Sequence, residues 1–168
     1  MVKRDSRLEF LGGAYVFPGG AVDEADRDQV FLELLDGFDQ EEAAQAFDMD
    51  DSVRARAFYV AAMRELFEEA GILLAKREGE WADARGDRAL GARLDQARPH
   101  VASGELPLAE LLADEDLTLA ADNLFDFAHW ITPEGGKKRF DTRFFVAPMP
   151  ECQSAEHDNV ESTDGRWL

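Results

Sequence analysis

Apolar residues recur every three or four positions between residues 57 and 74, a pattern typical of a helix packed against a core. The positions that follow this spacing are Val60, Met63, Phe67, Ala70 and Leu74. Ser52 precedes the pattern as the expected N-cap, and Gly71 follows it as the expected C′ residue. We therefore predict a helix over about residues 53–70.

Three carboxylates lie on the opposite face of this predicted helix. Glu65, Glu68 and Glu69 stand at positions i, i+3 and i+4, so their side chains converge on one patch. Like charges at this spacing repel by ~0.2–0.5 kcal/mol per pair, and a positive charge nearby would offset that cost. The patch is either a site for a hard divalent cation, which prefers oxygen ligands, or a solvated acidic face.

Weaker patterns predict the remaining elements. Before the long helix, residues 14–17 read as a short strand between glycine turns, and residues 30–38 and 42–47 have helical spacing. After it come a helix within residues 81–97 that Pro99 would end, a short helix over residues 106–112 with Pro107 near its start, and strands over residues 124–131 and 140–149. A turn at residues 133–136 would join those two strands as an antiparallel pair.

Composition narrows the class of protein. A chain of 168 residues, 45% hydrophobic and 32% charged, suffices for one globular domain. Acidic residues outnumber basic ones 36 to 18, which disfavours binding to a nucleic-acid backbone. No apolar run of membrane-spanning length and no secretory signal is present, so we expect no membrane association. The single cysteine, Cys152, excludes an internal disulfide and suits a reducing cytoplasm, where we place the protein.

One stretch carries a family resemblance. Residues 64–72, Arg-Glu-Leu-Phe-Glu-Glu-Ala-Gly-Ile, match all seven specified positions in the second half of the Nudix box, G-x5-E-x7-R-E-U-x-E-E-x-G-U. Phe17-Pro18-Gly19-Gly20 resembles its opening, and Asp26 stands where the first glutamate is expected. Between Asp26 and Arg64 lie 37 residues where the usual box has seven, which implies an insertion of 30. Such an interrupted box resembles the extended-box subgroup that includes peroxisomal coenzyme A diphosphatases.

The resemblance implies a fold and a set of site residues. The expected fold is a single Nudix domain over residues 1–168, of α/β (α+β) class, with a mixed sheet flanked by helices and a helical insertion at residues 27–56. Mg²⁺ or Mn²⁺ is expected as the cofactor, bound by Glu65, Glu68 and Glu69, with Arg64 orienting a box carboxylate and Asp26 supporting the loop. The expected catalytic residues are Glu65, Glu68, Arg64 and Glu161. The expected substrate-binding residues are Gly19, Gly20, Lys137 and Arg139.

The implied activity is hydrolysis of a diphosphate bond in a small-molecule nucleoside diphosphate derivative, with coenzyme A or acyl-coenzyme A as the foremost substrate. The pattern that usually accompanies coenzyme A, S-x3-R-x3-G-x3-F-P-G-G, is not met, because Asp5 and Glu9 replace its Ser and Arg. ADP-ribose and NADH therefore stay open as substrates. So does a binding module of Nudix fold that does not cleave its nucleotide.

Several assignments stay open at this stage. Glu65, Glu68, Glu156 and Glu161 are all candidates for the general base. The cations at positions 137, 138, 139 and 143 either contact phosphate groups or balance nearby acid, and His129 is interpreted as structural. The insertion is a candidate lid, acyl-chain pocket or dimer surface, so a homodimer is an open alternative. Compared with the family pattern, we expect a strand to be missing at the N-terminus and a helix to be missing at the C-terminus.

Overall fold

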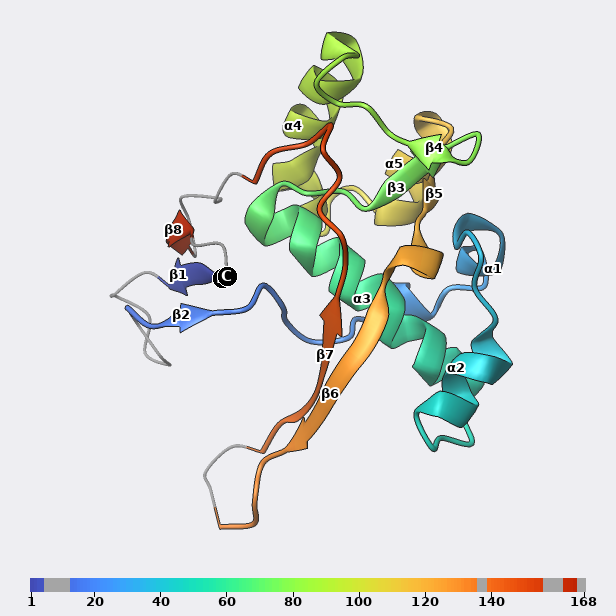
Figure 1. Cartoon of the computed structure of the whole chain (residues 1–168), viewed down its shortest axis with the longest axis vertical. Coiled ribbons are helices and arrows are strands. Elements are labelled where there is room, and N and C mark those ends of the chain that lie inside the picture. The colour runs from blue at the N-terminus through green and yellow to red at the C-terminus, as the bar shows by residue number, and fades with distance from the viewer. Residues whose placement is uncertain (5–12, 136–138, 156–161, 166–168) are drawn as a thin grey trace.

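The longest helix, α3 (Ser52–Ala70), crosses the molecule and carries the predicted carboxylates (Figure 1). The structure is a computed structural model that describes residues 1–4, 13–135, 139–155 and 162–165. Gly71 ends α3 in the left-handed conformation, with φ 69°, and its amide donates to the Phe67 carbonyl at 2.9 Å, as predicted. The N-cap prediction was wrong. Asp51 caps the helix, because its carboxylate accepts a hydrogen bond from the Arg54 amide at 2.9 Å.

The apolar face of α3 packs into the main core. Val60, Met63 and Phe67 are fully buried there, as the helical spacing predicted. They belong to one buried cluster with apolar side chains that follow α3 in the chain, among them Leu73, Leu74, Leu90, Leu94, Leu112, Leu117 and Leu119. The opposite side of α3 is thereby left for the polar residues of the site.

The insertion is helical, as predicted. It contains α1 (Phe31–Leu34) and α2 (Gln40–Ala46), and η1 (Ala25–Arg27) leads into it. The α2 helix begins at the Asp39 side chain, which accepts from two amides of its first turn. A second, smaller core joins the insertion to the start of α3, formed by Ala43, Ala44, Phe47 and Ala55. Buried Arg56 of α3 fastens the insertion further, since it donates to the Arg27 and Asp28 carbonyls at 2.7 and 3.1 Å.

A sheet of three short strands follows α3 in the chain, together with two α-helices. The antiparallel strands β3 (Ala75–Arg77), β4 (Glu80–Trp81) and β5 (Thr118–Leu119) are arranged in the order β4-β3-β5. They are accompanied by α4 (Arg88–Ala102), α5 (Leu108–Asp114) and η2 (Ala121–Asn123). A single parallel bridge within the described chain, Leu35 to Leu119, connects this sheet to the end of α1.

The predicted limits of the helix within residues 81–97 were wrong at both ends. Trp81 lies in β4, and α4 begins only after Asp87, whose carboxylate accepts from the Ala89 and Leu90 amides. Pro99 lies inside the helix instead of ending it, because burial of Leu94 and Val101 on the core side stabilises the turns around it. The short helix beside Pro107 is confirmed, but it begins and ends two residues later than predicted.

The predicted antiparallel pair is confirmed as β6 (Phe125–Ile131) and β7 (Asp141–Val146), a long hairpin that projects from the body (Figure 1). On the side of the body, the Phe145 ring lies 5.0 Å from that of Tyr59 in α3. The hairpin leaves large apolar side chains exposed, at 54%, 76%, 71% and 53% of their surface, which we call the apolar hairpin surface: Phe125, Phe127, Trp130 and Val146.

The two ends of the described chain meet in a third sheet. It consists of β1 (Val2–Arg4), β2 (Tyr15–Val16) and β8 (Ser162–Gly165) in the order β2-β1-β8, and its strands are antiparallel. In the part of the chain that the structure describes, no helix has both the length and the apolar character needed to cross a membrane.

Candidate functional site

Arg64 is the centre of the polar cluster on α3. Its guanidinium makes a bidentate ion pair with Asp26, at 3.0 Å from Nε and 3.1 Å from Nη2, and Nη2 also donates to the Ala21 carbonyl at 3.0 Å. Asp26 is only 2% exposed and accepts a further hydrogen bond from the Asp23 amide at 2.8 Å. Asp26 therefore fixes the loop over residues 21–26 onto α3, 38 residues away along the chain.

Two of the predicted metal ligands converge on the same guanidinium. Arg64 Nη1 donates to Glu65 Oε1 at 3.0 Å and to the two carboxylate oxygens of Glu68 at 3.1 and 3.2 Å. The side chains of Glu65 and Glu68 are each only 13% exposed. This burial excludes a solvated acidic face as the interpretation of these two residues. They form a desolvated pair of carboxylates that share one cation.

The electrostatics of the cluster follow from this burial. Burial raises the pKa of Glu65, the Arg64 charge opposes that rise, and the Glu68 charge adds to it. Burial likewise raises the pKa of Glu68 against the opposing effect of Arg64. Burial disfavours the charge of Arg64 too, yet the hydrogen bonds and charge of Asp26, with the charges of both glutamates, raise its pKa. Arg64 thus stays protonated, and one cation is left to offset three buried carboxylates.

The glycine loop approaches this pair closely at one position. A Cβ atom on Gly20 would lie 2.3 Å from Glu65 Oε1, so any larger residue would displace the carboxylate or the loop. A Cβ atom on Gly19 would meet nothing within 4 Å. Of the two predicted substrate-binding glycines, Gly20 is therefore the one whose backbone lies against the carboxylate site.

These residues suit a divalent cation. Carboxylate oxygens are the ligands that Mg²⁺ and Mn²⁺ prefer, and the incompletely offset charge of Glu65 and Glu68 favours a further cation. Glu69, the third predicted ligand, is half-buried one residue farther along α3. Within residues 1–4, 13–135, 139–155 and 162–165, no three Asp, Glu, His or Cys side chains are already gathered as a metal site. Binding would need Glu65 and Glu68 to turn partly from Arg64.

Comparison with known proteins decides the family. The sequence profile of the NUDT19 Nudix domain matches residues 1–168. The chain belongs to this Nudix family. It is 28% identical over 197 residues to the acyl-coenzyme A diphosphatase NUDT19 of Homo sapiens and 30% identical over 198 residues to that of Gallus gallus. Each alignment covers 99% of this chain and 52% of the relative, so the chain spans about half the length of the curated relatives it matches.

A solved structure agrees with this assignment. The crystal structure of a NUDIX hydrolase from Alicyclobacillus acidocaldarius superposes with a TM-score of 0.58 and 27% sequence identity, covering 94% of this chain and 66% of the other. The Nudix α/β fold predicted from the box is therefore confirmed. In the Nudix box itself, Asp26 takes the place of the first glutamate in sequence and supports Arg64 in space.

Other predicted residues of this Nudix chain lie in the β6–β7 hairpin. Arg139 is exposed in the hairpin turn, where its Nε donates to the Thr132 carbonyl at 3.3 Å. Arg143 does not belong to a basic surface, which corrects our grouping of it with residues 137–139. Its buried guanidinium lies 3.7 Å from the centre of the Phe47 ring and donates to the Phe47 carbonyl at 2.9 Å, because the hairpin packs on α2. His129 pairs with Asp141 across the hairpin at 2.5 Å, consistent with a structural role.

Four predicted residues fall outside the described residues: Lys137, Lys138, Glu156 and Glu161. In contrast, the structure reveals a contact that no sequence pattern indicated. Arg98 of α4 donates from Nε to the carbonyl oxygen of Glu68 at 2.9 Å. The two residues are 30 positions apart in different helices, so this contact could be found only from the tertiary structure.

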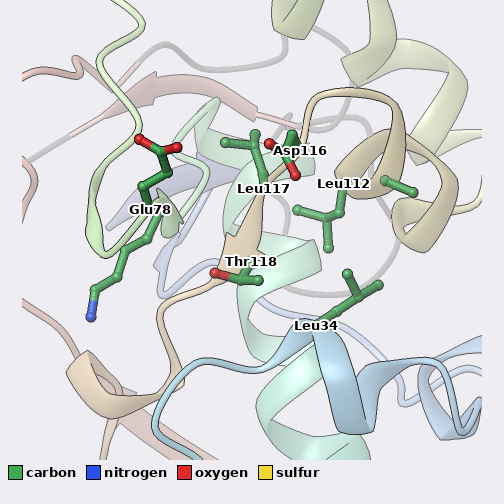
Figure 2. Close-up of a pocket in the computed structure, with 8 residues that line it drawn as sticks. Leu34, Glu78, Leu112, Asp116, Leu117 and Thr118 are labelled. Atoms are coloured by element: carbon green, nitrogen blue, oxygen red, sulfur yellow. The ribbon is translucent and has the colours of Figure 1, made fainter.

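A separate cavity is lined by residues of other elements (Figure 2). It has a volume of about 200 Å³ between α1, α5 and the β3–β5 sheet, and is lined by Leu34, Lys76, Glu78, Leu112, Ala113, Asp116, Leu117 and Thr118. Lys76 Nζ pairs with Asp36 and Asp122 at 3.1 and 2.6 Å, which joins the insertion to the sheet. Glu65, Glu68 and Gly20 do not line the cavity, so it is distinct from the carboxylate site.

Proposed function

We propose that this chain is a Nudix hydrolase that cleaves a diphosphate bond in coenzyme A or acyl-coenzyme A, with Mg²⁺ or Mn²⁺ as cofactor. The observation that carries the proposal is the desolvated pair Glu65 and Glu68, oriented by Arg64 and lying against the Gly20 backbone. The substrate class is supported by the human and chicken relatives, which are named acyl-coenzyme A diphosphatases.

Glu65, Glu68 and Glu69 are the residues that would bind the cation. A divalent ion there would screen the diphosphate charge and polarise phosphorus toward attack by water. Arg64 restricts the rotamers of Glu65 and Glu68 through hydrogen bonds of 3.0 to 3.2 Å, and Asp26 restricts Arg64 in turn. Arg64 thereby holds both carboxylates together, and each would turn partly from Arg64 to bind the cation.

The remaining roles complete the proposal. Gly19 and Gly20 would form the loop beside the diphosphate, and Lys137 and Arg139 would contact phosphate groups from the hairpin turn. Glu161 would bind metal or activate the attacking water, with Glu65, Glu68 and Glu156 as the other candidates for the general base. The whole chain would act as one domain, with residues 27–56 as an insertion in its box.

A second candidate function follows from a departure in the sequence. Asp5 and Glu9 occupy the positions where the pattern associated with coenzyme A has Ser and Arg. ADP-ribose or NADH would keep the same chemistry, since each contains a diphosphate bond joined to a nucleoside. The non-catalytic alternative is a module of Nudix fold that binds such a nucleotide without hydrolysing it.

A hydrolysis screen tests the proposal. The purified chain would be incubated with Mg²⁺ or Mn²⁺ and coenzyme A, acyl-coenzyme A, ADP-ribose or NADH, and the products identified by mass. We expect 3′,5′-ADP and a 4′-phosphopantetheine product from coenzyme A. Cleavage of ADP-ribose or NADH alone would contradict the coenzyme A assignment. No cleavage of any of the four by a folded sample would contradict catalysis.

A further inference from the structure

The C-terminal turn of α3 carries negative charge that the helix itself does not balance. Glu68 and Glu69 both lie in this turn, and the last turn of α3 contains no basic residue. Because the carbonyl groups at the C-terminal end of a helix carry a partial negative charge, carboxylates there are destabilised and a nearby cation is favourable. Glu68 and Glu69 are proposed cation ligands, so the geometry of this turn matters for the site.

Arg98 supplies a cation to this turn from another helix. Figure 1 shows α4 beside the C-terminal end of α3, and the half-buried side chain of Arg98 reaches from it to the Glu68 carbonyl, with 2.9 Å between Nε and oxygen. The last four carbonyls of a helix have no donor within the helix, so Arg98 satisfies one of them. The guanidinium also lies at the negative end of the helix dipole.

We propose that Arg98 is a positioning residue for the carboxylate site. Glu68 is then fixed at two points: Arg64 hydrogen-bonds its carboxylate, and Arg98 hydrogen-bonds its backbone. Fixing the backbone keeps the Glu68 side chain directed toward Glu65, which a two-carboxylate cation site requires. This inference depends on the proposed function, because the position of Glu68 affects cation binding only if Glu68 is a ligand.

The segment after α3 has an independent anchor. The buried side chain of Gln153 accepts from the Leu73 amide at 3.0 Å and donates to the Leu73 carbonyl at 2.7 Å. This two-way pairing fixes the backbone two residues beyond Gly71. Removal of the Arg98 guanidinium would therefore leave this anchor of the chain after the helix in place.

The test compares three variants with the wild-type chain. Arg98→Met removes the hydrogen bond and the charge, whereas Arg98→Lys keeps the charge and one donor. Arg93→Met is the control on the same helix as Arg98. It removes the pairing of Arg93 with Glu115, which follows α5. The Mn²⁺ dissociation constant is measured by electron paramagnetic resonance, the melting temperature without metal by circular dichroism, and kcat and KM on the cleaved substrate. Loss of groups that orient metal ligands typically weakens binding about 10- to 100-fold.

We expect Arg98→Met to weaken Mn²⁺ binding at least ~10-fold and to lower kcat more than it changes KM, while Arg98→Lys stays within ~3-fold of wild type. Arg93→Met should lower the melting temperature and leave the Mn²⁺ dissociation constant unchanged. Unchanged Mn²⁺ binding in a folded Arg98→Met variant would overturn the positioning role and leave the proposed hydrolase intact. So would an equal loss in Arg93→Met. A folded wild-type chain that binds no Mn²⁺ would overturn the metal site and the positioning role together.

Discussion

At the scale of single residues, the charge of Arg64 offsets the repulsion and burial of the carboxylates on α3 and so stabilises the fold. Arg64 is the partner of buried Asp26 and of Glu65 and Glu68, whose side chains are largely buried. We expect Arg64→Met to lower the free energy of unfolding by about 3–5 kcal/mol, because removal of one partner leaves an uncompensated buried charge. Urea unfolding at neutral pH measures this loss.

Arg27→Met is the matched control for that variant. Arg27 makes a long ion pair of 3.8 Å with Glu24, and both side chains are substantially exposed. Exposed pairs contribute at most about 1 kcal/mol, so this variant should unfold close to wild type. A loss in Arg64→Met as small as that in Arg27→Met would mean that the buried Asp26 does not depend on Arg64 as its charge partner.

Glu68 is the residue whose charge the proposed chemistry needs most directly. Glu68→Gln keeps the shape of the side chain and removes a charge that burial already disfavours, since burial raises the Glu68 pKa. We therefore expect a lower hydrolysis rate, by about 100-fold or more, without loss of thermal stability. Exposed Glu110→Gln on α5 serves as the control. Wild-type turnover by Glu68→Gln would remove Glu68 from the site.

At the scale of elements, the sequence predicted a helix or strand correctly where its formation depends on residues close together in the chain. The periodicity around Phe67 and the glycine at position 71 predicted the length of α3 correctly, and the turn at residues 133–136 predicted the hairpin. Pro99 misled the prediction because burial of Val101 outweighs the local preference of proline. The Arg64 network was implied by the box, whereas Arg98 and Gln153 reach residues 30 and 80 positions away that no short pattern connects.

The contact between α4 and the end of α5 makes a prediction about acid stability. Glu115 is buried and accepts a bidentate pair from Arg93 at 2.5 and 2.7 Å. These hydrogen bonds lower the Glu115 pKa from its usual value of 4.5, although burial opposes them. Because the folded pKa lies below the unfolded one, Glu115 stabilises the fold above about pH 4.5, and this contribution is lost as the pH falls through the folded pKa.

Glu115→Gln tests this contribution. The difference in free energy of unfolding between wild type and Glu115→Gln should be largest near pH 6–7 and should shrink as the pH is lowered toward 3. Urea unfolding at a series of pH values measures it, with Glu110→Gln as a control that carries no such pairing. A difference that is constant with pH would mean that the Arg93 pair does not perturb Glu115.

At the scale of the whole molecule, two cores, the hydrogen bonds of Arg56 and the ion pairs of Lys76 hold the insertion to the Nudix scaffold. Arg56 fastens its entrance, and Lys76 fastens Asp36 at its far side to the sheet. The sequence located the insertion by counting between Asp26 and Arg64, and it predicted its helices. It did not predict how the insertion packs, because Arg56 and Lys76 act through partners that lie in other elements.

The apolar hairpin surface lies on a chain whose formal net charge is −18. Copies of such a molecule repel one another across a Debye length of about 30 Å in 0.01 M salt, and of only about 3 Å in 1 M salt. Added salt should therefore convert a repulsive solution into an attractive one, as Phe127 and Trp130 of neighbouring molecules come within reach. We expect the second osmotic virial coefficient from light scattering to be positive at low salt and to decrease toward zero or below it at 1 M sodium chloride.

Phe127→Ser with Trp130→Ser should keep that coefficient positive throughout, and an identical salt response of this variant would assign the attraction to another surface. The same titration tests the homodimer alternative, which predicts a fixed doubling of mass instead of a graded change. Formulation follows directly from the outcome: the chain would be concentrated most safely in dilute buffer, and its crystallisation would be sought by raising ionic strength.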